Sequence, residues 1–212
     1  MFDRLNKTAS RLVLASASPQ RRKILADAGY QFEVFDPGEV ENTIEAAPTP
    51  EALAIGKARA KAMHIAAILK PPFPALVVGV DTIVVLDGDI IGKPLDRIDA
   101  AAILSRLSGT RHRVISGMCL WRVDELSRPG GFPRDPAPLL VADTTWVKMR
   151  KMTVNEIDEY VASGESDGKA GAYAIQEKGD RFVESLDGSL LNVIGFPLEL
   201  FQQIRPDTVW ES

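Results

Sequence analysis

The chain has 212 residues, a formal net charge of −4 at pH 7, and 45% hydrophobic and 25% charged residues, which fits one sizeable globular core. No long basic run occurs, which argues against a nucleic-acid polymer as the main partner, although a small anion needs only a local cluster of positive charge. One cysteine, Cys119, and two histidines exclude an intrachain disulfide and a structural zinc site, whereas a hard cation held by carboxylates stays open.

Strand and helix signals alternate along the chain. We predict strands at 12–15, 31–35, 75–80, 82–86, 90–91, 112–122, 139–149 and 182–186, and helices at 20–28, 50–69, 96–107, 153–162 and 190–204. Because this alternation shows no compositional break, it predicts an α/β protein with a single domain over residues 1–212. The proline- and glycine-rich stretch 127–138 is expected to be an inserted loop.

The first motif is SASPQRR, at the predicted transition from a strand to a helix. The start of a helix presents unpaired N–H groups, Ser16 and Ser18 add hydroxyls, and Arg21 and Arg22 add guanidinium groups. These groups together suit a phosphate or a triphosphate. The same residues also fit an ordinary helix that Ser18 caps, with arginines in solvent.

The second motif is VVGVDTIVVLDGDIIGKP. Asp81 follows a very apolar run, so we expect it at the end of a strand and facing a cleft, because a buried carboxylate is costly without partners. There it would ligate a divalent cation or act as a general base on water. Lys93 follows a predicted hairpin and would neutralise phosphate, or simply remain solvated.

The third motif is SGESDGKAGAYAIQEKG, in which glycine allows a ligand to approach the backbone closely. Lys169 would meet a phosphate there, and Gln176 offers a donor and an acceptor suited to the edge of a base. A flexible loop is the alternative interpretation. Neither a Walker-type phosphate loop nor a dinucleotide fingerprint is present in the sequence.

Five stretches together resemble the signature blocks of the Maf family: LASASPQRRKIL, GVDTIVVLDGDIIGKP, LSGTRHRV, SGESDGKAGAYAIQ and GSLLNVIGFPLE. They occur in the family's order and cover nearly the whole chain, so the set is far more specific than any one block. The resemblance implies a mixed twisted sheet with flanking helices around a deep cleft, similar to the inosine triphosphatase class. It also implies a nucleoside triphosphate pyrophosphatase, a divalent cation (Mg²⁺ or Mn²⁺) and often a homodimer.

The resemblance also assigns roles to residues. Asp81 matches the proposed catalytic base, and Glu41 matches a carboxylate that helps to hold metal or water. The residues that match phosphate-binding positions are Ser16, Arg21, Arg22, Lys57, Lys93 and Lys169.

Three further positions distinguish branches of the family. Thr82 and Gln176 match the branch that prefers dTTP and UTP, whereas Gln20 stands where that branch has an arginine. Gly168 also replaces the usual aspartate before Lys169. A pyrophosphatase for modified nucleotides such as 7-methyl-GTP therefore stays open, as does a nucleotide-binding regulator of cell division without catalysis.

The sequence contains no segment with the pattern of a signal peptide or of transmembrane length. We therefore expect a cytoplasmic protein without a membrane partner, whose ligand is a nucleoside triphosphate.

Overall fold

The structure is a computed structural model that describes residues 11–70, 72, 74–123, 137–176 and 178–204. The strands in this part of the chain are β1 (Arg11–Ala15), β2 (Glu33–Phe35), β3 (Ala75–Leu86), β4 (Asp89–Ile91), β5 (Arg111–Val123), β6 (Leu139–Met149) and β7 (Val183–Asp187). The helices are α1 (Pro19–Asp27), α2 (Pro50–Ile68), α3 (Arg97–Leu107), α4 (Val154–Ala162), α5 (Leu190–Ile194) and α6 (Leu198–Ile204). Of the loop predicted at 127–138, residues 127–136 lie outside the described residues.

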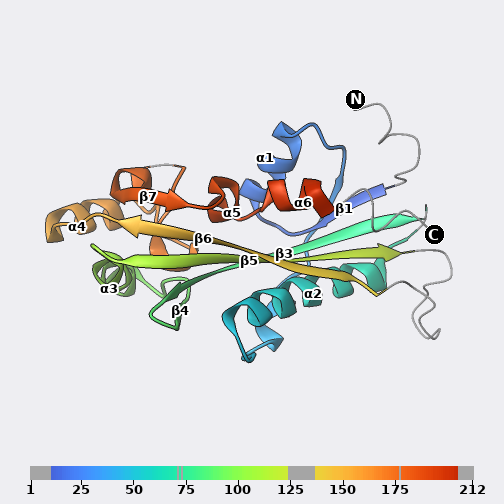
Figure 1. Cartoon of the computed structure of the whole chain (residues 1–212), viewed down its shortest axis with the longest axis horizontal. Coiled ribbons are helices and arrows are strands. Elements are labelled where there is room, and N and C mark those ends of the chain that lie inside the picture. Colours follow the sequence, from blue (N-terminus) through green and yellow to red (C-terminus); the bar gives the residue numbers. More distant parts are fainter. Residues whose placement is uncertain (1–10, 71, 73, 124–136, 177, 205–212) are drawn as a thin grey trace. The chain divides into compact units, whose positions relative to one another are not determined.

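The seven strands form one mixed sheet in the order β2-β1-β3-β5-β6-β7, with β4 paired to β3 off this path (Figure 1). β1 pairs in parallel with β2 and β3, whereas β4 pairs antiparallel with β3 and β7 pairs antiparallel with β6. The predicted α/β class, with a mixed sheet and flanking helices, is therefore confirmed.

The chain divides into two compact units. Unit 1 comprises Met1–Asp81, Gly117–Ala142 and Leu198–Ser212, and unit 2 comprises Thr82–Ser116 and Asp143–Pro197. Each unit has its own hydrophobic cluster. In unit 1, β1, β3 and β5 bury residues such as Val13, Val77 and Cys119 against α2. In unit 2, α3 and α4 pack together and bury Leu104 and Tyr160.

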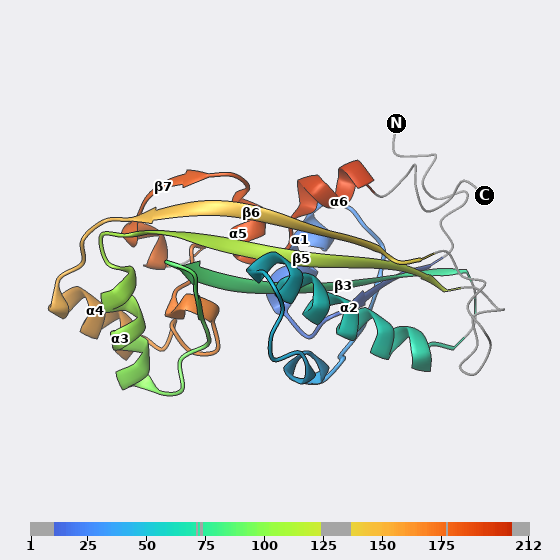
Figure 2. The same ribbon diagram turned by 60° about the horizontal axis from the view of Figure 1, so that its bottom comes forward.

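In unit 1, α2 lies alongside β3 and β5 (Figures 1 and 2), and two glycines allow its close approach. A Cβ at Gly79 would be 2.2 Å from the Ala58 carbonyl oxygen, and one at Gly117 would be 2.2 Å from the Ala54 carbonyl carbon. Any side chain at either position would therefore push the helix away from the strands.

Several local signals act as predicted. Ser18 caps α1 with Pro19 in its first turn, and Thr153 forms a capping box with Glu156 at the start of α4. Asp87 and Gly88 both have positive φ, as a two-residue hairpin turn between β3 and β4 requires.

Two predicted elements differ from the structure. The two strands predicted at 75–80 and 82–86 are one continuous strand, β3. The helix predicted at 190–204 is two helices, because Gly195, with φ of 124°, ends α5 and Pro197 follows it.

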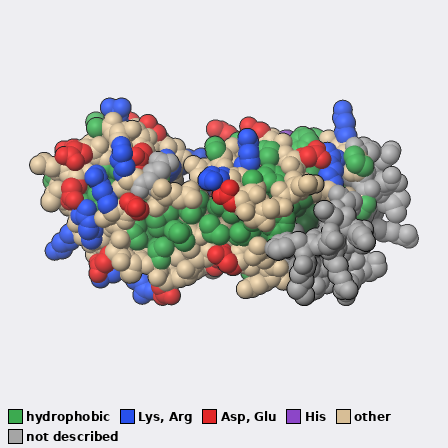
Figure 3. Space-filling model, turned by 90° about the horizontal axis from the view of Figure 1, so that it is seen from above, with side chains coloured by type: hydrophobic (Ala, Val, Ile, Leu, Met, Phe, Trp, Pro, Cys, Tyr) green, Lys and Arg blue, Asp and Glu red, His purple; other side chains and the backbone are tan. Residues whose placement is uncertain are grey.

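On the face shown in Figure 3, positively and negatively charged side chains are interspersed among the described residues.

The longest helix of the described part, α2, carries Lys57, Arg59 and Lys61. None of the helices described is both long and apolar enough to cross a lipid bilayer.

Candidate active site

The turn after β1 holds a connected set of hydroxyl and guanidinium groups in unit 1. The Ser16 Oγ accepts hydrogen bonds from the Ser18 backbone N–H (3.2 Å) and from the Arg21 Nη1 (3.1 Å). Ser16 is 3% exposed and Arg21 is 9% exposed, so this guanidinium is not a solvated surface group. Burial lowers the pKa of Arg21 from its ordinary value, and the negative charges of Asp81 and Glu41 oppose that change.

Asp81 lies midway along β3 and is 9% exposed. Our expectation that it ends a strand is wrong, because β3 continues without interruption to Leu86. The register nevertheless places Asp81 near the turn after β1. Ala15 pairs with Gly79 in parallel, so β1 ends where β3 approaches Asp81. The chain following β1 and the Asp81 carboxylate therefore belong to the same end of this strand pair.

Lys61 is the partner of this buried carboxylate. Its Nζ lies 2.6 Å from the Asp81 Oδ1 and 2.9 Å from the Glu41 Oε1. The two carboxylate oxygens are therefore separated by no more than the sum of these distances. Lys61 itself is 6% exposed.

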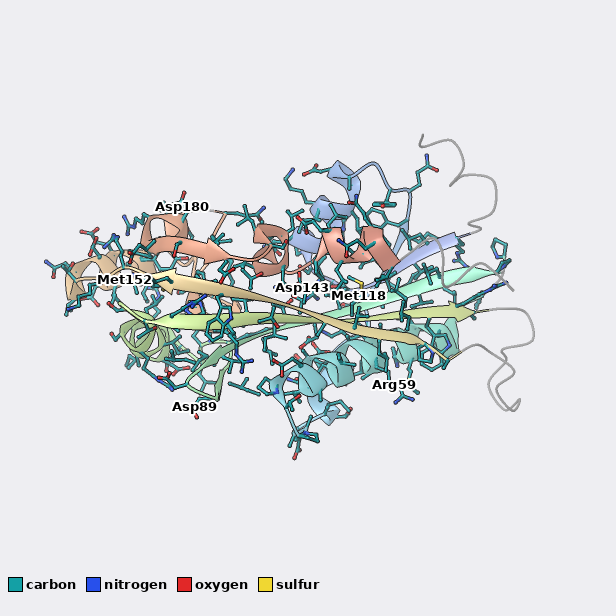
Figure 4. The ribbon with its side chains drawn as sticks, viewed as in Figure 1. Arg59, Asp89, Met118, Asp143, Met152 and Asp180 are labelled. Carbon is teal, nitrogen blue, oxygen red and sulfur yellow. The ribbon has the colours of Figure 1, made fainter. Side chains whose placement is uncertain are left out.

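Helix geometry explains why Lys61 faces the carboxylates. Lys57 and Lys61 are one turn apart and share a face of α2, whereas Arg59 falls between them on the opposite face. Arg59 is exposed and lies on the outer side of the helix (Figure 4). The close contact at Gly79 holds Ala58 and Ala62 against β3, which fixes the backbone on both sides of Lys61.

Glu41 reaches the site from a short 3₁₀ helix at Val40–Thr43. Its side chain is 18% exposed. Ser16, Arg21, Glu41, Lys61 and Asp81 together form what we call the Asp81 cluster. It contains two positive and two negative groups with little access to water, a setting in which charge interactions are strong.

The remaining predicted residues of unit 1 are more exposed than most of the Asp81 cluster. Lys57 is half-buried and Arg22 is exposed. Arg22 lines a pocket together with Phe32 and Asp36. Gln20 is half-buried, and its Oε1 accepts a hydrogen bond from the Ser18 hydroxyl at 3.1 Å. Gln20 is therefore part of the hydrogen-bonded turn that contains Ser16 and Arg21.

In unit 2, the segments that carry Lys93 and Lys169 lie side by side. The Gly171 N–H donates a hydrogen bond to the Gly92 carbonyl (3.1 Å), which joins the residues next to both lysines. Lys93 is exposed. The Lys169 Nζ donates to the Glu165 carbonyl at 2.7 Å, so its ammonium bonds within its own loop.

The two branch-marking residues of unit 2 differ in their surroundings. Thr82 is half-buried, and its Oγ1 lies 2.8 Å from the Ser116 Oγ and 3.4 Å from the Gly195 carbonyl oxygen. The Ser116 hydroxyl also lies 3.3 Å from the Asn192 carbonyl oxygen. Gln176 is exposed in a turn.

Sequence reasoning missed Lys61. The signal that could have found it is the carboxylate itself, since an aspartate inside a strand as apolar as β3 requires a positive partner. The i, i+4 spacing from Lys57 marks Lys61 as the residue on the same helix face. Nothing in the local sequence, however, connects α2 with Asp81.

The donor set of the cluster fits a hard divalent cation that is shared with a ligand. Mg²⁺ is usually held by one or two carboxylates together with phosphate oxygens and water, and Asp81 and Glu41 supply two carboxylates in one place. Among the residues that the structure describes, no three His, Cys, Asp or Glu side chains gather into a metal site of their own. Phosphate or water oxygens would have to complete the coordination.

Comparisons with known proteins show which family this chain is similar to. A family model described as Maf-like protein matches residues 11–205. A protein of Geobacter metallireducens named dTTP/UTP pyrophosphatase is 41% identical over 197 residues, which is 92% of this chain and 95% of that protein. A Vibrio cholerae protein of the same name is 41% identical over 90% of this chain and 94% of its own length.

A human protein is similar over part of its length. It is named probable bifunctional dTTP/UTP pyrophosphatase/methyltransferase protein and is 40% identical over 196 residues. The match covers 90% of this chain but 31% of the human protein.

Proposed function

Because this chain belongs to the Maf family, we propose that it is a nucleoside triphosphate pyrophosphatase that hydrolyses dTTP and UTP to the monophosphate and pyrophosphate. The observation that carries the proposal is the Asp81 cluster. It combines a carboxylate that can take a proton from water with a buried arginine and a serine beside the start of a helix. A base that activates water and positive groups that stabilise phosphate charge are what hydrolysis of a phosphate anhydride uses.

In the proposed reaction, Asp81 or Glu41 orients a water molecule and takes its proton as the water oxygen bonds to the α-phosphorus. The bond between the α-phosphorus and the bridging oxygen breaks, and pyrophosphate leaves. Arg21, Ser16 and the N–H groups at the start of α1 stabilise the negative charge on the phosphates. Lys57, Lys93 and Lys169 are proposed to bind phosphate as well.

We also propose a divalent cation, Mg²⁺ or Mn²⁺, held by Asp81 and Glu41. When bound, it would polarise phosphate oxygens and neutralise part of their charge. The support for it is the pair of carboxylates gathered at Lys61 and the hard oxygen chemistry of the substrate.

The choice of dTTP and UTP is supported by the names of the relatives and by Thr82 and Gln176, which match that branch.

The whole chain is proposed to act as one pyrophosphatase domain, since the family match at 11–205 includes residues of both units. A homodimer and a cytoplasmic location are proposed from the family resemblance and the single cysteine, and light scattering of the purified protein tests the former.

The direct test measures pyrophosphate and orthophosphate released from dTTP, UTP, 7-methyl-GTP and the common nucleotides, with Mg²⁺ or Mn²⁺. We expect pyrophosphate alone, fastest from dTTP and UTP. Nucleotide binding without release would instead favour a regulator, and faster cleavage of 7-methyl-GTP would overturn the assigned branch.

The Asp81→Asn variant tests the cluster. It should fold and lose about 100-fold or more in turnover, as expected when a general base is removed. Asp27→Asn is the matched control, because it removes an exposed carboxylate of unit 1 that also pairs with a lysine. Turnover of Asp81→Asn equal to that of the control would contradict the role of Asp81.

A further inference from the structure

We propose that Lys61 is a positioning residue that acts as the built-in counter-cation of the Asp81–Glu41 pair, and that a divalent cation must displace its ammonium from these carboxylates. The metal part of this inference rests on the proposed function. The ion pairs themselves are features of the structure.

The geometry shows that a single ammonium holds both carboxylates. The Lys61 Nζ is within ion-pair distance of Asp81 (2.6 Å) and Glu41 (2.9 Å). The three side chains are 7%, 12% and 18% exposed, so water screens these contacts weakly. The same carboxylates are those that would bind a cation.

The backbone of Lys61 is fixed, whereas its ammonium is not. Ala58 and Ala62 pack against Gly79, and a Cβ on that glycine would meet the helix backbone at 2.2 Å and 2.9 Å. α2 therefore cannot move closer to β3. The four-carbon stem of lysine, however, has several rotatable bonds, so the Nζ can leave the carboxylates without any movement of the helix.

Charge balance explains why the ammonium must leave. Arg21 and Lys61 supply two positive charges and Asp81 and Glu41 two negative charges, so the four groups are neutral together. Without nucleotide, a divalent cation would have to bind at a site that is already neutral. The Asp81 and Glu41 carboxylates that would hold the cation are paired with Lys61 there. A triphosphate brings negative charge that would attract the displaced ammonium. We therefore infer that the metal binds weakly by itself and more tightly together with the nucleotide.

The experiment titrates Mn²⁺ into the whole protein by calorimetry, without nucleotide. Replacing Lys61 by methionine keeps a long side chain but removes the charge, so we expect Mn²⁺ to bind at least about tenfold more tightly, because a repelling charge near the site is gone. A purely structural role for Lys61 predicts no tightening. Lys61→Gln is a second variant, expected to act in the same direction if the methionine variant fails to fold.

Lys23→Met is the matched control. This substitution also removes one positive charge from unit 1 and breaks a lysine–aspartate pair. In this pair, however, the side chains of both Lys23 and Asp27 are more than 60% exposed. We expect its Mn²⁺ affinity to stay within about twofold of the wild type, because exposed charges are screened.

Adding Asp81→Asn to Lys61→Met should remove the gain, which places the metal at this carboxylate pair. Equal or weaker Mn²⁺ binding by the Lys61 variants, or a gain that survives Asp81→Asn, would overturn the inference. Pyrophosphate release by the wild type is measured separately, so failure of the inference is distinguishable from failure of the proposed function.

Discussion

At the scale of single residues, the buried charges of unit 1 depend on one another. Lys61 has Asp81 and Glu41 as ion-pair partners. The negative charges of both carboxylates also favour the charged form of the Arg21 guanidinium. Removing one member of such a set typically costs about 3–5 kcal/mol, since the remaining charges stay buried without compensation. Such an arrangement is costly as a means of stability alone, which favours a role in function.

Gln20 is the residue at which this chain differs from the pattern expected for the dTTP/UTP branch. Its amide oxygen accepts from the Ser18 hydroxyl, whose oxygen accepts in turn from the Arg21 N–H at 3.4 Å. A guanidinium at this position would add positive charge beside the proposed phosphate-binding turn.

We therefore expect Gln20→Arg to increase kcat/KM for dTTP and UTP by about tenfold, which corresponds to one added charge-assisted hydrogen bond. Steady-state kinetics on both nucleotides measures this effect. Gln20→Met, which adds no charge, is the control and should not show the increase. An unchanged or lower kcat/KM in the arginine variant would mean that position 20 does not contact the substrate.

At the scale of elements, the contact between α2 and β3 places Lys61. This contact has no room for even one methyl group at Gly79, because the Ala58 carbonyl oxygen lies 2.2 Å from the position of a Cβ. The small residues Ala58 and Ala62 on the facing side of the helix are fully buried. The distance from Lys61 to Asp81 thus depends on how closely the helix approaches the strand.

Gly79→Ala should lower the free energy of unfolding by about 1–3 kcal/mol, the usual cost of overpacking a core. It should also reduce turnover, since α2 and Lys61 would shift relative to Asp81. Urea unfolding and pyrophosphate release measure the two effects. Gly92→Ala is the control for stability, because no atom lies within 4 Å of its Cβ position and its φ is not positive. Equal stability of the two variants would contradict the tight contact.

Elements with local signals could be predicted from the sequence, and elements without them could not. Ser18 with Pro19 marked the start of α1, and Thr153 with Glu156 marked α4. The 3₁₀ helix that carries Glu41 was not predicted, because short turns of this kind have no periodic pattern. The interruption expected at Asp81 was wrong, since the charge there is compensated from another element.

The candidate site could be predicted from the sequence only in part. Ser16, Arg21, Glu41 and Asp81 were expected together on family resemblance, and the structure brings them together in unit 1. Lys61 was not expected, because its pairing with Asp81 joins residues 20 positions apart through tertiary packing. The roles of these residues stay predictions.

At the scale of the whole molecule, His112 links stability to pH. It is fully buried, its Nε2 lies 2.8 Å from the Tyr173 hydroxyl, and its Nδ1 has no partner among the described residues. Burial lowers the pKa of His112 from 6.5 to about 4. Between these two values the unfolded chain binds a proton that the folded protein does not, so the folded state loses stability as the pH falls.

As the pH falls from about 6.5 towards 4, we expect His112 to lower the free energy of unfolding by as much as about 1.4 kcal/mol per pH unit. His112→Gln, which can still hydrogen bond to Tyr173 but does not titrate, should lack that part of the pH dependence. Urea unfolding at pH 7, 6 and 5 measures it. His64→Gln, at an exposed histidine, is the control. The same pH dependence in all three proteins would contradict the prediction.

The central claim is that water attacks the α-phosphorus of a nucleoside triphosphate at the Asp81 cluster. Hydrolysis of dTTP in water labelled with oxygen-18, followed by mass spectrometry of the products, tests it most directly. The claim predicts the label in the nucleoside monophosphate, unlabelled pyrophosphate, and little product from Asp81→Asn. Label in pyrophosphate or orthophosphate, or equal product from Asp81→Asn, would contradict it.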